Sequence, residues 1–266
     1  MDLELDGKVA IVTGGSRGIG KAVARQLARE GVQVVLVART REPLEAAARE
    51  LAAETGQRFE AITADTGLDE SVRAMVMQAH RAFGRIDILV NCAAVPGGQG
   101  PVPSLGGITD ALFFDDVNVK VMGYIRCARE VAPYMERQGW GRIISISGLA
   151  ARSAAGIVGS IRNAAVVALA KNIADQLGPK GINSTVVHPG TTRTEAVAAR
   201  LAAQASESGV SLAEVERQLA ETTSIKRVID ASDIANVVAF LASPKSVAIN
   251  GDVIPAGGGV PRAIYY

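Results

Sequence analysis

Cysteine and histidine are scarce in this sequence. Its 266 residues include two cysteines, Cys92 and Cys127, and two histidines. The spacing of the cysteines matches no disulfide framework and no metal-binding motif. We therefore expect two reduced thiols, as in most cytosolic proteins, and no metal site.

Long apolar runs and an excess of charge of one sign are also missing. The formal net charge is +1 and there is no long basic segment, so charge gives no reason to expect nucleic acid as a partner. No continuous apolar stretch reaches the roughly 18 residues of a membrane span. The N-terminus, MDLELDG, is acidic and leads straight into a predicted strand, unlike a signal peptide. We expect a cytoplasmic protein without a membrane segment.

Strand-like and helix-like segments alternate along the whole chain. Buried parallel strands are typically continuous β-branched runs, such as QVVLVA, and the helices here show apolar residues at helical spacing. The predicted strands are 8–13, 33–38, 59–64, 86–91, 141–147, 183–188 and 248–255. The predicted helices are 19–30, 43–55, 69–83, 115–138, 163–177, most of 195–222, and 233–241, with a loop over 96–107. This alternation predicts one α/β domain over residues 1–266, a doubly wound Rossmann fold with a parallel sheet of about seven strands.

The most informative motif is TGGSRGIG, from Thr13 to Gly20. Glycines at 14, 18 and 20 follow a predicted strand and open a predicted helix. Glycine permits a positive φ and a close approach of the main chain to a ligand. The free N–H groups at the start of a helix bind phosphate. The motif therefore predicts a dinucleotide site, against the alternative of a simple turn.

Motifs along nearly the whole chain resemble those of the short-chain dehydrogenase/reductase family, in particular members like 3-oxoacyl-ACP reductases. TGGSRGIG is similar to the family's N-terminal fingerprint, and NCAA at 91–94 to its NNAG segment. GRIISIS from 141 resembles the family's fifth strand. HPGTTRTE at 188–195 resembles the segment that covers the nicotinamide, and INGDVIPAGGG at 249–259 resembles the C-terminal strand and turn.

The resemblance implies an NADP(H) site rather than an NAD(H) site. Relatives that use NAD usually carry an acidic residue at the end of the second strand, where this chain has Ala38 followed by Arg39. Arg17, within the glycine turn, provides a second guanidinium that can pair with a 2′-phosphate. The alternative is that both arginines are merely solvated. The cofactor-binding residues implied in this way are Gly14, Ser16, Arg17, Gly18, Ile19, Gly20, Arg39, Asp65, Thr66, Asn91, Ala93, Asn163, Pro189, Gly190 and Thr191.

The catalytic half of the family's site is altered. In the family a serine orients the carbonyl, and a Tyr-x-x-x-Lys pair supplies the proton, the lysine lowering the pKa of the tyrosine. GSIRNAAVVALAK, starting at Gly159, resembles the family's YSASKAAVIGLTK and places Gly159 and Asn163 at the tyrosine and lysine positions. A second frame places Ile161 and Ala165 there. No tyrosine lies between residues 135 and 264 in either case.

Two catalytic residues of the family have candidates. Asn118 falls on the helix asparagine that holds a water next to the lysine. The usual serine position is Gly148, with Ser147 next to it. Ser147 is equally consistent with a strand-end serine bonded to backbone. Without the lysine, Asn163 is able to hydrogen-bond a ribose hydroxyl but not to lower the pKa of a neighbouring group.

Substitutes for the missing acid are few. Tyr124 and Tyr134 are expected to pack at helix interfaces, and Tyr265 and Tyr266 end the chain. His188 titrates in a useful range but is expected to be a packed neutral histidine. Arg162 is able to hold an anionic group of the substrate, although a solvated arginine is the simpler interpretation.

The sequence favours an NADP(H)-dependent oxidoreductase acting on a carbonyl, an alcohol or a related small molecule, with a degraded catalytic tetrad. The alternative is a catalytically inactive NADP(H)-binding homologue with a sensing or assembly role, and lyase chemistry in the same pocket is a third possibility. We expect residues 195–222 to form a helical substrate lid. The resemblance implies a homotetramer or a homodimer.

Overall fold

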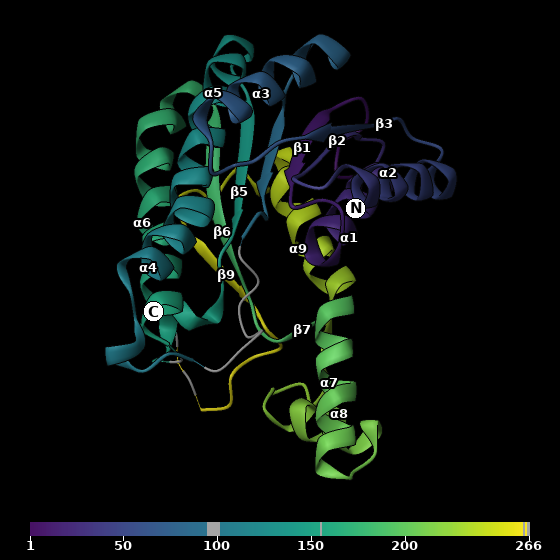
Figure 1. The fold of residues 1–266 in the computed structure, drawn as a ribbon. Helices are drawn as coiled ribbons and strands as arrows, with labels where there is room; N and C mark the ends of the chain where they lie inside the picture. The colour runs from purple at the N-terminus through teal and green to yellow at the C-terminus, as the bar shows by residue number, and fades with distance from the viewer. Residues whose placement is uncertain (95–101, 155, 263, 265–266) are drawn as a thin grey trace.

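The computed structural model describes residues 1–94, 102–154, 156–262 and 264. Its centre is a seven-stranded sheet in the order β3-β2-β1-β4-β5-β6-β9, and every neighbouring pair is parallel (Figure 1). This confirms the predicted doubly wound sheet of about seven strands. The strands are β1 (Val9–Thr13), β2 (Gln33–Ala38), β3 (Phe59–Thr63), β4 (Ile88–Asn91), β5 (Gly141–Ile146), β6 (Ile182–Pro189) and β9 (Val253–Ala256).

Helices cover both faces of the sheet (Figure 1). One layer contains α1 (Gly18–Arg29), α2 (Arg41–Thr55) and α9 (Ala231–Ala242), and the other contains α3 (Asp69–Phe83), α5 (Gly123–Gln138) and α6 (Ile157–Leu177). Alternate residues of a strand enter the two cores, since successive side chains point to opposite faces. Val34 and Leu36 of β2 pack toward α1, whereas Val35 and Val37 pack toward α3.

The topology places the ligand-binding edge between β1 and β4. The chain order of the strands reverses there, because β2 and β3 lie to one side of β1, and β4 and β5 lie to the other. In open α/β sheets, ligands bind at such a switch point, beyond the carboxyl ends of the strands. The glycine turn that follows β1 lies at this edge.

Three predicted boundaries were wrong by five or six residues. The helix expected from 115 begins at Asp110, where the Thr109 hydroxyl accepts a hydrogen bond from the amide of Leu112 at 3.2 Å. It runs as α4 (Asp110–Val117), a π-helical turn (Asn118–Met122) and α5. The helix expected from 163 begins at Ile157. The last strand covers 253–256 instead of 248–255, because Asn250 and its neighbours turn to bond the start of β6.

The segment 195–222 consists of two helices, α7 (Glu195–Ser208) and α8 (Leu212–Glu221), and it projects from the rest of the chain (Figure 1). A small parallel sheet of β7 (Thr192–Arg193) and β8 (Ile229–Asp230) lies at its base, and strands this short have no sequence signature. Of the loop expected over 96–107, residues 96–101 lie outside the described residues, and 105–107 form a 3₁₀ turn.

Among the described residues, one helical stretch is long and apolar enough to cross a membrane by length and composition. It is Ile157–Lys180, which comprises α6 and the turn after it. In this structure α6 packs along β6, and its buried residues include Arg162 and Asn163. The stretch therefore forms part of the second helical layer.

Candidate active site

The turn between β1 and α1 requires glycine at several positions. Gly14 and Gly18 have φ values of +68° and +58°, in the left-handed region. At Gly20 an added Cβ would lie 2.3 Å from the Gly14 carbonyl oxygen. The turn exposes the first amides of α1, and the N–H of Gly18 donates to a carboxylate oxygen of Glu195 at 3.0 Å. The helix start thus already binds a negatively charged oxygen, which is the property that a pyrophosphate site needs.

A long groove follows the carboxyl edge of the sheet. It consists of two adjoining cavities of about 410 and 970 Å³. They share Ile19, Cys92, Ala94, Ile146 and Thr194. Among the predicted cofactor residues, those lining the smaller cavity are Gly14, Ser16, Arg17, Ile19, Gly20, Arg39, Thr66 and Ala93. Ile19, Pro189, Gly190 and Thr191 line the larger cavity, together with the predicted catalytic Ser147.

Five of the predicted site residues line neither cavity: Gly18, Asp65, Asn91, Asn118 and Asn163. Gly18 lies on the side facing Glu195. The Asn91 amide is buried at the end of β4, and neither of its polar side-chain atoms has a hydrogen-bond partner among the residues that the structure describes. Such an unpaired amide next to the groove fits a site that is completed by a polar ligand. The assigned roles of these residues remain predictions.

Two arginines lie on the wall of the smaller cavity. Arg17 and Arg39 are both exposed, and neither guanidinium group forms a hydrogen bond or ion pair with any described residue. No carboxylate lines this cavity; Ala38 and Thr40 flank Arg39. A phosphate that entered here would meet two guanidinium groups without displacing an existing ion pair.

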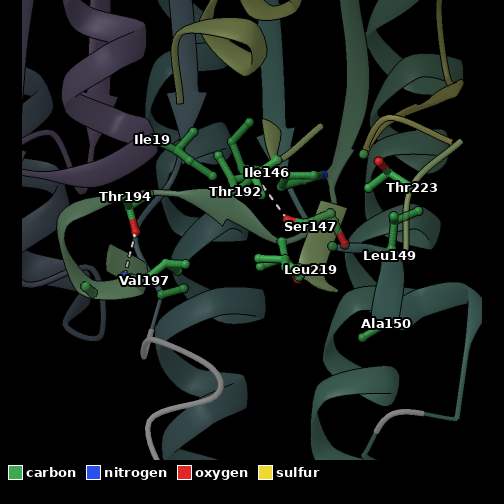
Figure 2. A pocket seen from close by; sticks show the side chains of 18 of the residues that line it. Ile19, Ile146, Ser147, Leu149, Ala150, Thr192, Thr194, Val197, Leu219 and Thr223 are labelled. Atoms are coloured by element: carbon green, nitrogen blue, oxygen red, sulfur yellow. Dashed lines mark hydrogen bonds between the residues drawn. The ribbon is translucent and has the colours of Figure 1, made fainter. Parts of the chain in front are cut away.

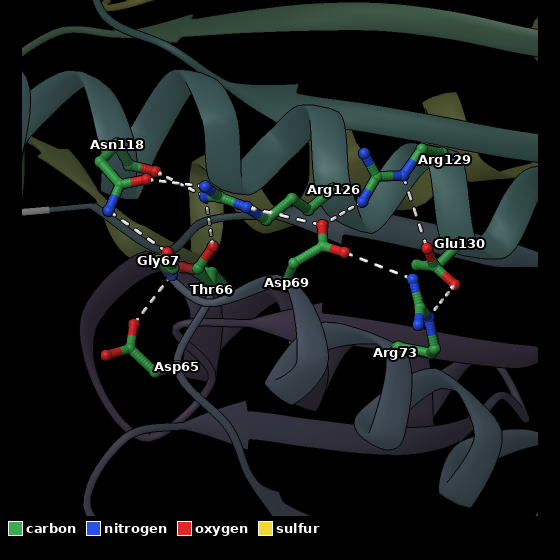
Figure 3. A network of polar contacts seen from close by, with 9 residues as sticks. All are labelled: Asp65, Thr66, Gly67, Asp69, Arg73, Asn118, Arg126, Arg129 and Glu130. Atoms are coloured by element: carbon green, nitrogen blue, oxygen red, sulfur yellow. Dashed lines mark hydrogen bonds and ion pairs between the residues drawn. The ribbon is translucent and has the colours of Figure 1, made fainter.

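Asn118 belongs to a polar network between the loop after β3 and the long helix (Figure 3). Its side chain donates to the Gly67 carbonyl at 3.3 Å and accepts from Arg126 at 2.9 Å. Arg126 also donates to the Thr66 carbonyl at 3.1 Å. Asp65 accepts from the Gly67 amide at 2.8 Å. The network holds the loop after β3, including the groove residue Thr66, against the long helix.

Ser147 lies in the wall of the larger cavity, directly after β5 (Figure 2). Its hydroxyl donates to the Asn163 backbone carbonyl at 3.0 Å. The Asn163 amide nitrogen lies 3.1 Å from where a Cβ on Gly148 would be, so this amide occupies the space beside Gly148. At Gly159 an added Cβ would meet no atom of the described residues within 4 Å, apart from the neighbouring backbone of its own helix. Space for a larger side chain at 159 is therefore present.

A charged group that sequence reasoning did not select lies in the same cavity. Lys120, in the π-helical turn, is 5% exposed and lines the larger cavity. Its Nζ donates to the Ser147 carbonyl at 3.1 Å. Burial and the charge of Arg162 lower the pKa of Lys120 to about 7, although Asp116 acts in the opposite direction. Asp116 itself forms an ion pair with Arg162. The available signal was a lysine between valines in NVKVMG, since a charged residue within an apolar helical run suggests a special environment.

The other candidate acids within the described residues are occupied, whereas Tyr265 and Tyr266 lie outside the described residues. Tyr124 is buried, its hydroxyl donates to the Ile146 carbonyl at 2.9 Å, and burial raises the pKa of its phenol. His188 is buried, and its Nδ1 accepts from the Gly148 amide at 3.2 Å. Burial and nearby positive charge, from Arg152 and then Lys120, lower the pKa of His188 to about 4, so the imidazole is neutral at pH 7. The Tyr134 ring of α5 packs against the His80 ring of α3, with the ring centroids 4.5 Å apart and the ring planes tilted by 38°.

Comparison with known proteins identifies the family. The profile described as enoyl-(acyl carrier protein) reductase matches residues 14–261. The chain belongs to the short-chain dehydrogenase/reductase family. The short-chain reductase protein NovJ from Streptomyces niveus is 34% identical over 257 residues, which cover 95% of this chain and 94% of NovJ.

Solved members of this reductase family share the whole fold. The L-sorbose reductase of Gluconobacter frateurii, in complex with NADPH and L-sorbose, aligns with a TM-score of 0.92 at 30% identity, covering 99% of this chain and 100% of the reductase. An actinorhodin polyketide ketoreductase with NADPH aligns with a TM-score of 0.87 at 28% identity, covering 96% of this chain and 98% of the ketoreductase. These relatives are reductases of different small molecules, so family membership does not specify one substrate.

Proposed function

We propose that this chain is an NADP(H)-dependent oxidoreductase that interconverts a carbonyl and an alcohol, or a related pair, on a small-molecule substrate. The observation that carries the proposal is the groove itself. It joins the glycine turn, two arginines without a carboxylate partner and a second cavity of about 970 Å³. The NADPH complexes of two structural relatives support the choice of cofactor.

The residues of the groove have separable roles in this proposal. Arg17 and Arg39 would bind the 2′-phosphate, and the amides after Gly14 would bind the pyrophosphate. Thr66 and Ala93 would contact the adenosine half, and Gly190 and Thr191 would flank the nicotinamide, as would Pro189. The bound nicotinamide supplies hydride. Asp65 would lie by the adenine, and the buried side chains of Asn91 and Asn163 would support the ribose path.

We further propose that the catalytic tetrad is atypical. Gly159 and Asn163 occupy the usual tyrosine and lysine positions, Ser147 would hydrogen-bond the substrate, and Asn118 would position the helix. Hydride transfer does not itself require the tyrosine, and loss of general acid catalysis typically costs roughly 10²–10⁴-fold. A slow but real reaction is therefore consistent with this site.

Residues 195–222 would act as the lid of a domain that spans residues 1–266. Val197, Ala199 and Arg200 of α7 and Leu219 of α8 line the larger cavity, so movement of these helices would change access to it. We propose a cytoplasmic homotetramer or homodimer that binds neither nucleic acid nor membrane.

Calorimetric titration with NADPH and with NADH tests the cofactor, and NADPH consumption with a panel of aldehydes, ketones, diketones and enoyl compounds tests the reaction. We expect tight NADPH binding, weak NADH binding and turnover above background with at least one class of compound. Binding of neither cofactor would contradict the proposal. Binding without any turnover would favour the second candidate.

The second candidate is a catalytically inactive homologue that binds NADP(H) and acts in sensing or assembly. It is favoured by the open space at Gly159 and by the Asn163 amide beside Gly148. The double substitution Gly159→Tyr with Asn163→Lys tests it. Activity that appears only in the double variant would support an inactive native protein. Turnover by the unmodified protein would exclude it.

A further inference from the structure

The Lys120 ammonium lies buried at a place where no lysine of a Tyr-x-x-x-Lys pair is expected. The π-helical turn Asn118–Met122 interrupts the long helix between α4 and α5, and such turns occur frequently at functional sites. Lys120 lines the larger cavity together with Cys92, Ser147 and Arg162. A charged group inside a pocket of this size is costly unless something there binds it.

Hydrogen bonding leaves this ammonium incompletely satisfied. An ammonium carries three N–H donors. Within the described part of the chain, Nζ of Lys120 makes one hydrogen bond, to the Ser147 carbonyl at 3.1 Å, and no ion pair. The nearby carboxylate of Asp116 is paired with Arg162. Two donors therefore remain for an oxygen atom that enters the cavity.

The neighbouring hydroxyl and imidazole groups do not compete for this role. The Ser147 hydroxyl donates to a backbone carbonyl, and the Tyr124 hydroxyl donates to another. The His188 Nδ1 accepts a hydrogen bond from the Gly148 amide, so this nitrogen carries no proton that it could give to a substrate. Ser147 links this set together, since its carbonyl binds Lys120 and its side chain lines the same cavity.

We propose that Lys120 is the catalytic acid of this site, and that its Nζ gives a proton to the substrate oxygen during reduction and takes it back during oxidation. This inference rests on the proposed function. In the reductive direction, the carbonyl carbon gains a hydride with its electron pair from NADPH, which is oxidised. The C=O π bond breaks, the oxygen takes a proton from Nζ, and the resulting neutral amine regains a proton from water.

The electrostatic surroundings make this exchange feasible near neutral pH. The groups that face Lys120 are Asp116 from α4, Arg162 from α6, Cys92 after β4 and His188 at the end of β6. Burial raises the pKa of Cys92 to about 12, so the thiol is neutral. A lysine with a pKa of about 7 is protonated below that pH and a free amine above it. Reduction should therefore weaken as pH rises through 7, and oxidation should strengthen.

Two substitutions separate proton transfer from charge and packing. Lys120→Met keeps an unbranched side chain, one atom shorter and without the charge, whereas Lys120→Arg keeps a charge that does not deprotonate in proteins. The matched control is Lys171→Met, which removes an exposed lysine paired with Asp175 on α6. Thermal melting would show that all three variants fold.

The measurements are kcat/KM against pH with the carbonyl panel, the Kd for NADPH, and an NMR titration of ¹⁵N-lysine-labelled protein without cofactor. We expect one Nζ resonance to titrate near pH 7 in the unmodified and Lys171→Met proteins and to be missing in Lys120→Met. We expect kcat to fall roughly 10²–10⁴-fold in both Lys120 variants, the size of a lost general acid, with the Kd for NADPH within about twofold of the unmodified value.

The outcomes distinguish this inference from the proposed function. Turnover by the unmodified protein with full activity in Lys120→Met or Lys120→Arg would overturn the role of Lys120 and leave the oxidoreductase intact. A Lys120 resonance that titrates near pH 10 would overturn it as well. NADPH binding with no turnover of any panel compound would overturn both.

Discussion

Removing Arg39 should reduce the preference of the groove for NADPH over NADH. The guanidinium is exposed and forms no ion pair with a described residue, so Arg39→Ala breaks no existing salt bridge. A hydrogen bond to a charged group contributes about 1.5–3 kcal/mol, and solvent exposure places Arg39 at the low end of this range. A loss of about 1.4 kcal/mol is tenfold in Kd. We expect NADPH to bind about tenfold more weakly and NADH to be unchanged.

The double variant Arg17→Ala with Arg39→Ala should lose about 100-fold in NADPH affinity if the two guanidinium groups contribute independently. Calorimetry with both cofactors is the assay, at two salt concentrations, because added salt should weaken NADPH more than NADH. Arg49→Ala is the control, since it removes an exposed arginine of α2 outside the groove. Equal weakening of NADPH and NADH, or no change in either, would refute this assignment.

Three further predictions concern the turn, the lid contact and pH. Gly20→Ala should abolish NADPH binding and lower the melting temperature, because its Cβ would lie 2.3 Å from the Gly14 carbonyl oxygen; unchanged binding would contradict this. Glu195→Gln should tighten NADPH binding about two- to fivefold, because the neutral amide competes for the Gly18 N–H less strongly than the carboxylate, by roughly 0.3–1 kcal/mol. Calorimetry would measure the Kd, and weaker NADPH binding in this variant would contradict the prediction. The pKa of His188 is about 4 in the folded state and near 6.5 in the unfolded chain. Its neutral imidazole therefore contributes roughly 1–3 kcal/mol to the free energy of unfolding, and this contribution is complete above pH 6.5 and lost as the pH falls through 4. Urea unfolding should show this loss, and His188→Gln should reduce it.

The cofactor half of the site was predictable because its signals are local. The glycine turn needs particular residues at fixed positions between a strand and a helix, and the sequence shows them in order. The end of the second strand is likewise a local signal, because Ala38 and Arg39 stand where NAD-dependent relatives usually carry an acidic residue. The same reasoning located the segment Pro189–Thr191 on the larger cavity.

The catalytic half was less predictable because its contacts join residues far apart in the chain. The direction of the Lys120 side chain follows from a π-helical turn, which hydrophobic periodicity does not reveal. The contact between Glu195 and the amide of Gly18 spans 177 positions. Asn118 was expected to hold a water next to the lysine position, a role that stays a prediction, and the sequence did not reveal that its side chain bonds Gly67 and Arg126.

Isotope transfer tests the central claim most directly. The unmodified protein would be incubated with the carbonyl panel and NADPH that carries deuterium at its transferable position, and the products would be analysed by mass spectrometry. The account predicts an alcohol, or a reduced enoyl product, that contains one deuterium, together with an equal amount of NADP⁺. Tightly bound NADPH that keeps all its deuterium with every compound would contradict the claim that this groove carries out hydride transfer.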